Sequence, residues 1–116
     1  MGQLTTHVLE TATGQPAGGM AWGLYRAEPQ HSKIASGLTN TDGRNDGPVL
    51  EGADFTVGTY ELVFMVGDYF RSRGVDHPEP PFFDRVVLRF GISEADRHYH
   101  VPLLVSPYGY STYRGS

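Results

Sequence analysis

The chain has 116 residues and no cysteine, so it can form neither a disulfide framework nor a cysteine-based metal site. Positive charge is scarce, and the formal net charge of −4 at pH 7 argues against a surface that binds nucleic acid. No apolar run approaches the length of a membrane span, and the first residues lack the charged and apolar segments of a secretory signal. From these absences we expect a cytoplasmic protein that binds neither nucleic acid nor membranes.

Turn-forming and aromatic residues, by contrast, are abundant, with 15 Gly, 8 Pro, 7 Tyr and 6 Phe along the chain. This composition is typical of an all-β chain with many turns, and the length fits one domain over residues 1–116. Alternation of apolar and polar residues between segments rich in glycine and proline predicts short strands. The predicted strands cover residues 4–10, 20–28, 32–41, 49–50, 59–66, 82–92, 98–105 and 110–113.

A single short helix is predicted over residues 67–74, where Gly74 could form the C-terminal cap. Seven to eight short strands separated by regularly spaced turns are the pattern of a β-sandwich. We therefore expect an all-β fold in which two antiparallel sheets pack face to face, accompanied by one short helix.

The five histidines differ in their settings. His31 and His77 lie in turns near proline, where a solvated side chain is the simplest interpretation. His7 and His100 each lie within a strand, on the face opposite an apolar stripe, and their flanking residues are similar. A single strand histidine more often has a structural role, but two with this placement favour a shared site. Imidazole titrates at about 6.5, so such a pair could take a proton from water and return one.

Arg44 lies in the turn-rich segment 40–48, between predicted strands, where functional groups are often found. A guanidinium there could bind an anionic substrate or stabilise a developing oxyanion. The alternative is a turn arginine paired with Asp42 or Asp46, which for an isolated residue is the more common role.

A metal site is the competing interpretation of the histidines. His98 and His100, two residues apart on one strand, face the same way, and a third histidine could complete a zinc site. No carboxylate has a matching spacing, and Arg44 nearby would repel a cation. The sequence also lacks a phosphate-binding glycine loop and a serine elbow. It therefore predicts neither a metal nor a cofactor.

The last residues carry a distinctive pattern. An aromatic strand over residues 110–113 is followed directly by Arg114, Gly115 and Ser116. Most chains end in a few dispensable polar residues, so we expect this terminus to be docked and used.

Three segments resemble motifs of the 5-hydroxyisourate hydrolases, the transthyretin-related proteins of purine breakdown. They are the opening residues 4–17, the middle segment Thr41-Asp42-Gly43-Arg44, and the closing residues 110–116. The resemblance implies a transthyretin-like sandwich of eight strands and one short helix, assembled as a homotetramer, a dimer of dimers with a central channel. It implies hydrolysis of 5-hydroxyisourate to 2-oxo-4-hydroxy-4-carboxy-5-ureidoimidazoline.

The resemblance also implies site residues. Catalytic roles fall on four residues, His7, Arg44, His100 and Ser116. Substrate-binding roles fall on four more, Tyr113, Arg114, Gly115 and, in a supporting position, His98. Two alternatives remain open: a non-catalytic carrier of a small aromatic ligand, as in transthyretin, and a plain adhesive sandwich module.

Overall fold

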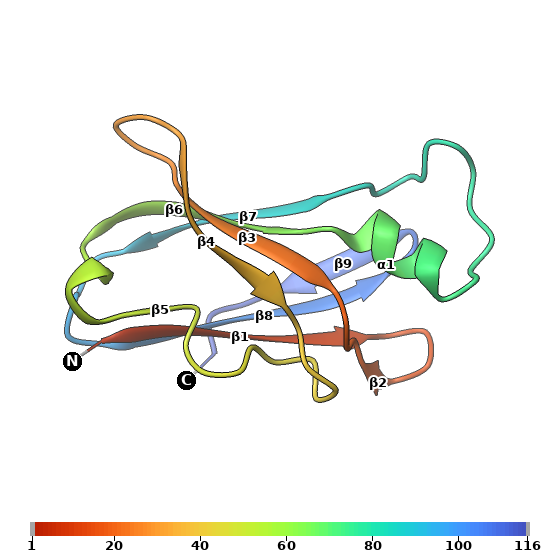
Figure 1. Cartoon of the computed structure of the whole chain (residues 1–116), viewed down its shortest axis with the longest axis horizontal. Helices are drawn as coiled ribbons and strands as arrows, with labels where there is room; N and C mark the ends of the chain where they lie inside the picture. Colours follow the sequence, from red (N-terminus) through yellow and green to blue (C-terminus); the bar gives the residue numbers. More distant parts are fainter. Residues whose placement is uncertain (1, 116) are drawn as a thin grey trace.

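The computed structural model describes residues 2–115 and consists of two β-sheets packed face to face (Figure 1). One sheet has the strand order β2-β1-β8-β9, with β5 also paired to β1, and the other has the order β4-β3-β6-β7. The first sheet comprises β1 (Gln3–Glu10), β2 (Gln15–Pro16), β5 (Leu50–Glu51), β8 (His98–Ser106) and β9 (Gly109–Thr112). The second comprises β3 (Ala21–Arg26), β4 (Ser32–Leu38), β6 (Gly58–Phe64) and β7 (Val86–Ile92). The predicted two-sheet sandwich is confirmed.

Two short helical segments accompany the sheets, a 3-10 turn over Gly52–Asp54 and the helix α1 (Val66–Ser72). The helix ends at Ser72, two residues before its predicted limit, and Gly74, with φ of +73°, lies beyond it in the left-handed conformation that glycine adopts most easily. No helix in residues 2–115 is both long and apolar enough to cross a membrane.

Alternation decides which face of each strand enters the core. On β1, Leu4, Thr6 and Val8 are buried, whereas Gln3, Thr5, His7 and Leu9 between them are partly exposed. Tyr99, Val101, Leu103 and Val105 form the matching buried stripe on β8. The polar Thr6 fits this stripe because its hydroxyl donates to the Val101 carbonyl at 2.7 Å. The histidine-bearing faces of β1 and β8 therefore point away from the core.

β1 and β8 pair in parallel, and this is the one pair among the described strands that departs from the predicted antiparallel arrangement. Its register sets Thr5 beside His100 and His7 beside Pro102. Paired residues on neighbouring strands share a face of the sheet, so the outer residues of both strands line one surface. Turn chemistry predicts hairpins between consecutive strands, which is why this pairing of the first long strand with the eighth was not predicted.

The predicted strand over 82–92 begins only at Val86. Phe82 and Phe83 instead pack against the hairpin that joins β8 and β9. The ring centroids of Phe82 and Tyr108 are 5.9 Å apart, and those of Phe83 and Tyr110 are 5.3 Å apart. Their apolar side chains therefore form part of an aromatic cluster and do not belong to a strand. The strand predicted over 32–41 likewise ends at Leu38, and Gln15–Pro16, predicted as loop, pairs with β1 as β2.

Candidate active site

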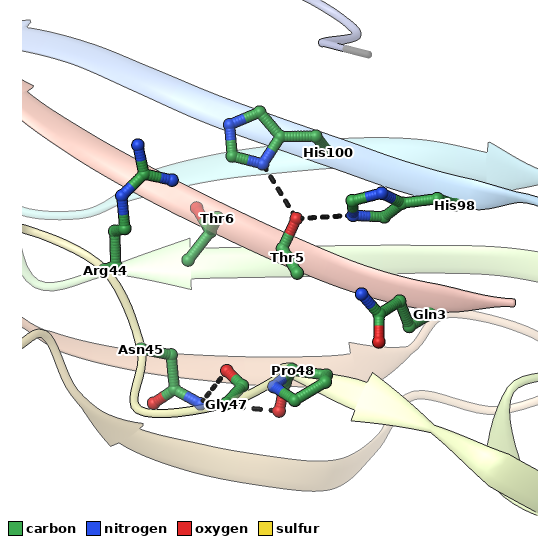
Figure 2. Close-up of a pocket in the computed structure, with 9 residues that line it drawn as sticks. All are labelled: Gln3, Thr5, Thr6, Arg44, Asn45, Gly47, Pro48, His98 and His100. Carbon is green, nitrogen blue, oxygen red and sulfur yellow. Dashed lines mark hydrogen bonds between the residues drawn. The ribbon is translucent and has the colours of Figure 1, made fainter.

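A cavity of about 550 Å³ lies on the outer face of β1 and β8, beside the loop that carries Arg44 (Figure 2). Its lining residues are Gln3, Thr5, Thr6, Arg44, Asn45, Gly47, Pro48, His98 and His100. Three of the residues predicted for the site, Arg44, His98 and His100, are therefore brought to one cavity from two distant parts of the chain.

Thr5 holds the two histidines of β8. Its Oγ1 lies 2.9 Å from His98 Nε2 and 2.8 Å from His100 Nδ1, both within hydrogen-bonding distance (Figure 2). His98 is exposed and His100 is half-buried. Sequence reasoning missed Thr5 because its position beside the histidines follows only from the parallel register of β1 with β8.

A tight turn positions Arg44. The Asn40 side-chain oxygen accepts hydrogen bonds from the backbone N–H groups of Asp42 and Arg44, at 2.9 and 3.1 Å. Gly43 has φ of +75°, and its carbonyl accepts a hydrogen bond from the Val8 N–H at 2.7 Å. That bond docks the turn on the edge of β1.

The guanidinium of Arg44 is exposed and lies on the side of the cavity that faces the His100 ring (Figure 2). None of the ion pairs between residues 2–115 includes Arg44. Asp46, one candidate partner, instead accepts a hydrogen bond from the Asn40 amide at 2.8 Å. The alternative of a turn arginine paired with a neighbouring carboxylate is therefore not what this structure contains.

His7 lies on the same outer face, where it forms an isolated backbone bridge with Arg44. It is half-buried and is not one of the residues that line the cavity. Burial lowers the pKa of His100 below its ordinary value of 6.5, and the positive charges of Arg44, His7 and His98 lower that pKa further. His100 is therefore mostly neutral at pH 7 and can accept a proton.

Gly115 contacts His100 directly. The Gly115 N–H donates to the His100 carbonyl at 2.7 Å, and a Cβ at position 115 would come within 2.5 Å of His100 Cδ2. A glycine is therefore needed for this close approach. Ser116, predicted to be catalytic, lies outside the described residues.

Tyr113 and Arg114 lie elsewhere. They line a second cavity of about 480 Å³ between β7 and β9, where the Arg114 guanidinium lies over the Tyr99 ring at 4.1 Å from its centroid. The closing segment is thus divided, because Gly115 contacts the site while these two side chains point into another cavity. Within residues 2–115, no three His, Asp or Glu side chains are grouped as metal ligands would be.

Residues 4–115 match the HIUase/transthyretin family. The chain belongs to this family. It is 64% identical, over 117 residues, to the 5-hydroxyisourate hydrolase of Pseudomonas aeruginosa, an alignment that covers 100% of this chain and 93% of that protein. Its fold matches (S)-allantoin synthase with a TM-score of 0.94 and 50% identity, over 99% of this chain and only 44% of that chain. It also matches transthyretin from Sparus aurata with a TM-score of 0.86 and 27% identity, over 97% and 96% of the two chains. The transthyretin-like form of the sandwich is thereby confirmed.

Proposed function

We propose that this protein is a 5-hydroxyisourate hydrolase of urate degradation. Support comes from the 64% identity to a hydrolase over nearly the whole of both chains, against 27% to a transthyretin. The observation that carries the proposal is the cavity in which His100, with a lowered pKa, lies beside an arginine that no carboxylate of residues 2–115 neutralises. A base and a fixed positive charge at one wall are what the hydrolysis of a cyclic amide needs.

In the proposed reaction, His100 takes a proton from water as the water oxygen attacks a ring carbonyl. The carbonyl oxygen becomes an oxyanion, and the guanidinium of Arg44 stabilises this negative charge. The carbon–nitrogen bond of the ring then breaks, and the leaving nitrogen receives a proton. His7, on the same face and bridged to Arg44, supplies a second acid–base group beside the first.

The remaining predicted residues have different support. Gly115 fixes the position of His100 through its backbone, so its role is to shape the site. Ser116 follows it directly in the sequence, and we propose that Ser116 positions water or substrate. A substrate role for Tyr113 and Arg114 stays a prediction, since in a single chain both line the second cavity.

The activity is tested by adding the protein to freshly generated 5-hydroxyisourate and following the decay of its ultraviolet absorbance. We expect decay well above the spontaneous rate, and His100→Asn should abolish the acceleration. A carrier would bind the compound and leave the decay rate unchanged, and that result would overturn the proposal.

We further propose that the enzyme acts as a homotetramer, a dimer of dimers. β7 and β9 are edge strands of the two sheets, and edge strands present unpaired backbone groups that can pair with another copy. A cavity on an outer face is also open to water until a second copy covers it. Sedimentation should give about four times the 12.8 kDa chain mass. A monomer would overturn this assembly and favour a plain sandwich module.

A further inference from the structure

The Thr5 hydroxyl lies between two imidazole nitrogens and carries only one proton. It is 2.9 Å from His98 Nε2 and 2.8 Å from His100 Nδ1. A hydroxyl can donate one hydrogen bond and accept two. When Thr5 donates to one histidine, the bond to the other forms only if that imidazole nitrogen is itself protonated.

This constraint links the proton positions on the two rings. If Thr5 donates to His98 Nε2, it accepts from His100 Nδ1–H, and a neutral His100 then has an unprotonated Nε2 that can act as a base. If His98 Nε2–H donates to Thr5, the hydroxyl donates to His100 Nδ1. A neutral His100 then carries its proton on Nε2 and can act as an acid.

The orientation of the rings fits this exchange. In Figure 2, His100 turns Nδ1 toward Thr5, while Nε2 lies on the side of the ring that faces Arg44. Nε2 is therefore the nitrogen available to water or substrate in the cavity. His98, at the other end of the arrangement, is exposed, so a proton that arrives there is solvated.

We propose that Thr5 is the positioning residue of a proton relay, His100–Thr5–His98, that converts His100 from base to acid during one turnover. The proposal rests on the hydrolase function proposed above. It assigns His98 the outer end of the relay, beyond the supporting role that the resemblance implies.

The relay conserves protons at each step. As water attacks the substrate, one water O–H bond breaks and its proton goes to His100 Nε2. The Nδ1 proton of His100 passes to Thr5 Oγ1, and the Thr5 hydroxyl proton passes to His98 Nε2. When the ring nitrogen leaves, it takes the proton from His100 Nε2, and the other two protons return along the same path. Histidine and threonine finish the cycle as they began it.

The surrounding charges give the relay a physical purpose. Burial and the positive charge of Arg44 disfavour a second proton on the His100 ring, and a proton on His7 or His98 adds to that repulsion. Moving that proton outward to the exposed His98 separates it from Arg44. His100 then stays neutral while Arg44 stabilises the oxyanion.

Thr5→Val tests the relay because valine keeps the branched shape and removes the hydroxyl. We expect kcat to fall by about 10²-fold, as for loss of general acid–base catalysis, with KM changed less than about twofold. Thr5→Ser restores the hydroxyl and should recover most of the lost kcat. Thr11→Val is the matched control, because the Thr11 hydroxyl donates to the Val105 carbonyl at the opposite end of the β1–β8 seam. This control should behave as wild type.

The relay also predicts non-additivity and a pH signature. His98→Phe should lower kcat to the same extent as Thr5→Val, and the double variant should lose no more than either single variant. In Thr5→Val, the acid limb of the pH profile should also move, because His98 no longer communicates with His100. A Thr5→Val enzyme with wild-type kcat and pH profile would overturn the proposal. A change in KM and melting temperature alone would overturn it in favour of a structural role.

A measurement on the unmodified protein keeps the proposal testable should Thr5→Val fail to fold. Nitrogen NMR of the histidines, about two pH units above the ordinary imidazole pKa of 6.5, reports which ring nitrogens are protonated. We expect one of the two nitrogens that face Thr5 to carry a proton and the other to lack one. Both protonated, or both unprotonated, would contradict the relay while leaving the measured hydrolase activity intact.

Discussion

Gly115→Ala offers a sharp test of how the closing segment supports His100. A Cβ at this position would lie 2.5 Å from His100 Cδ2, 3.2 Å from Cγ and 3.3 Å from Cβ. Carbon atoms pack at ~3.5 to 4.0 Å, so the closest contact is about 1 Å too short. Gly115 cannot simply withdraw, because its N–H is hydrogen-bonded to the His100 carbonyl at 2.7 Å. The imidazole is the part that must move.

The size of the effect follows from that displacement. A catalytic group misplaced by about 1 Å can cost ~10²-fold in rate, so we expect kcat to fall by about that factor. Gly115 does not have a positive φ, so alanine brings no backbone strain, and the melting temperature should change little. The assay is the ultraviolet decay of 5-hydroxyisourate, with circular dichroism melting as the check on folding.

Gly109→Ala is the matched control in the same closing segment. Its added Cβ would meet only the Ser106 hydroxyl oxygen, at an ordinary 3.7 Å. We expect wild-type kcat and stability for this variant. If Gly115→Ala also kept kcat within about twofold of wild type, the inferred steric support of His100 would be refuted.

Three further outcomes are expected. Arg44→Gln leaves burial as the main cause of the lowered His100 pKa but removes a positive charge, so the pKa should rise and the acid limb of the kcat/KM profile should move to higher pH. The value of kcat should also fall by about 10²- to 10³-fold, because the charge that stabilises the oxyanion is lost. An acid limb that does not move would contradict the assignment of His100 as the base. Gly43→Ala should lower the melting temperature more than Gly14→Ala, because both have positive φ but only at position 43 would a Cβ collide with the Val8 carbonyl. In urea titrations, the free energy of unfolding should fall as the pH drops below 6.5, the ordinary pKa of imidazole, because the unfolded chain binds a proton on His100 more readily than the folded protein does. His100→Gln should reduce this dependence of stability on pH.

Much of the sandwich could be predicted because burial imposes a period of two on each strand. Alternation alone predicts an apolar stripe on the strand face opposite His100, and the four residues of that stripe, Tyr99, Val101, Leu103 and Val105, are all buried. The same parity predicted that His98 and His100 would point away from the core. The alternation of residues along each strand therefore predicted which way the site residues point, and the resemblance to the hydrolase family predicted the reaction.

Other features depend on contacts that local pattern does not encode. The place of Thr5 follows from a parallel register between strands about 95 residues apart, which no turn signal specifies. Tyr113 and Arg114 point away from the cavity because β9 ends before them, so the strand parity no longer applies. The homotetramer and the cytoplasmic location stay predictions, and the role of Ser116 stays one as well.

The parallel seam between β1 and β8 joins the first long strand of the chain to one that emerges near its end (Figure 1). During synthesis, β1 can form this pair only after a partner about 95 residues later in the sequence has left the ribosome. Pairing at such a sequence separation closes a large loop and is expected to be a late, slow step in folding. The nascent chain therefore has no catalytic wall until β8 has been made and has paired with β1.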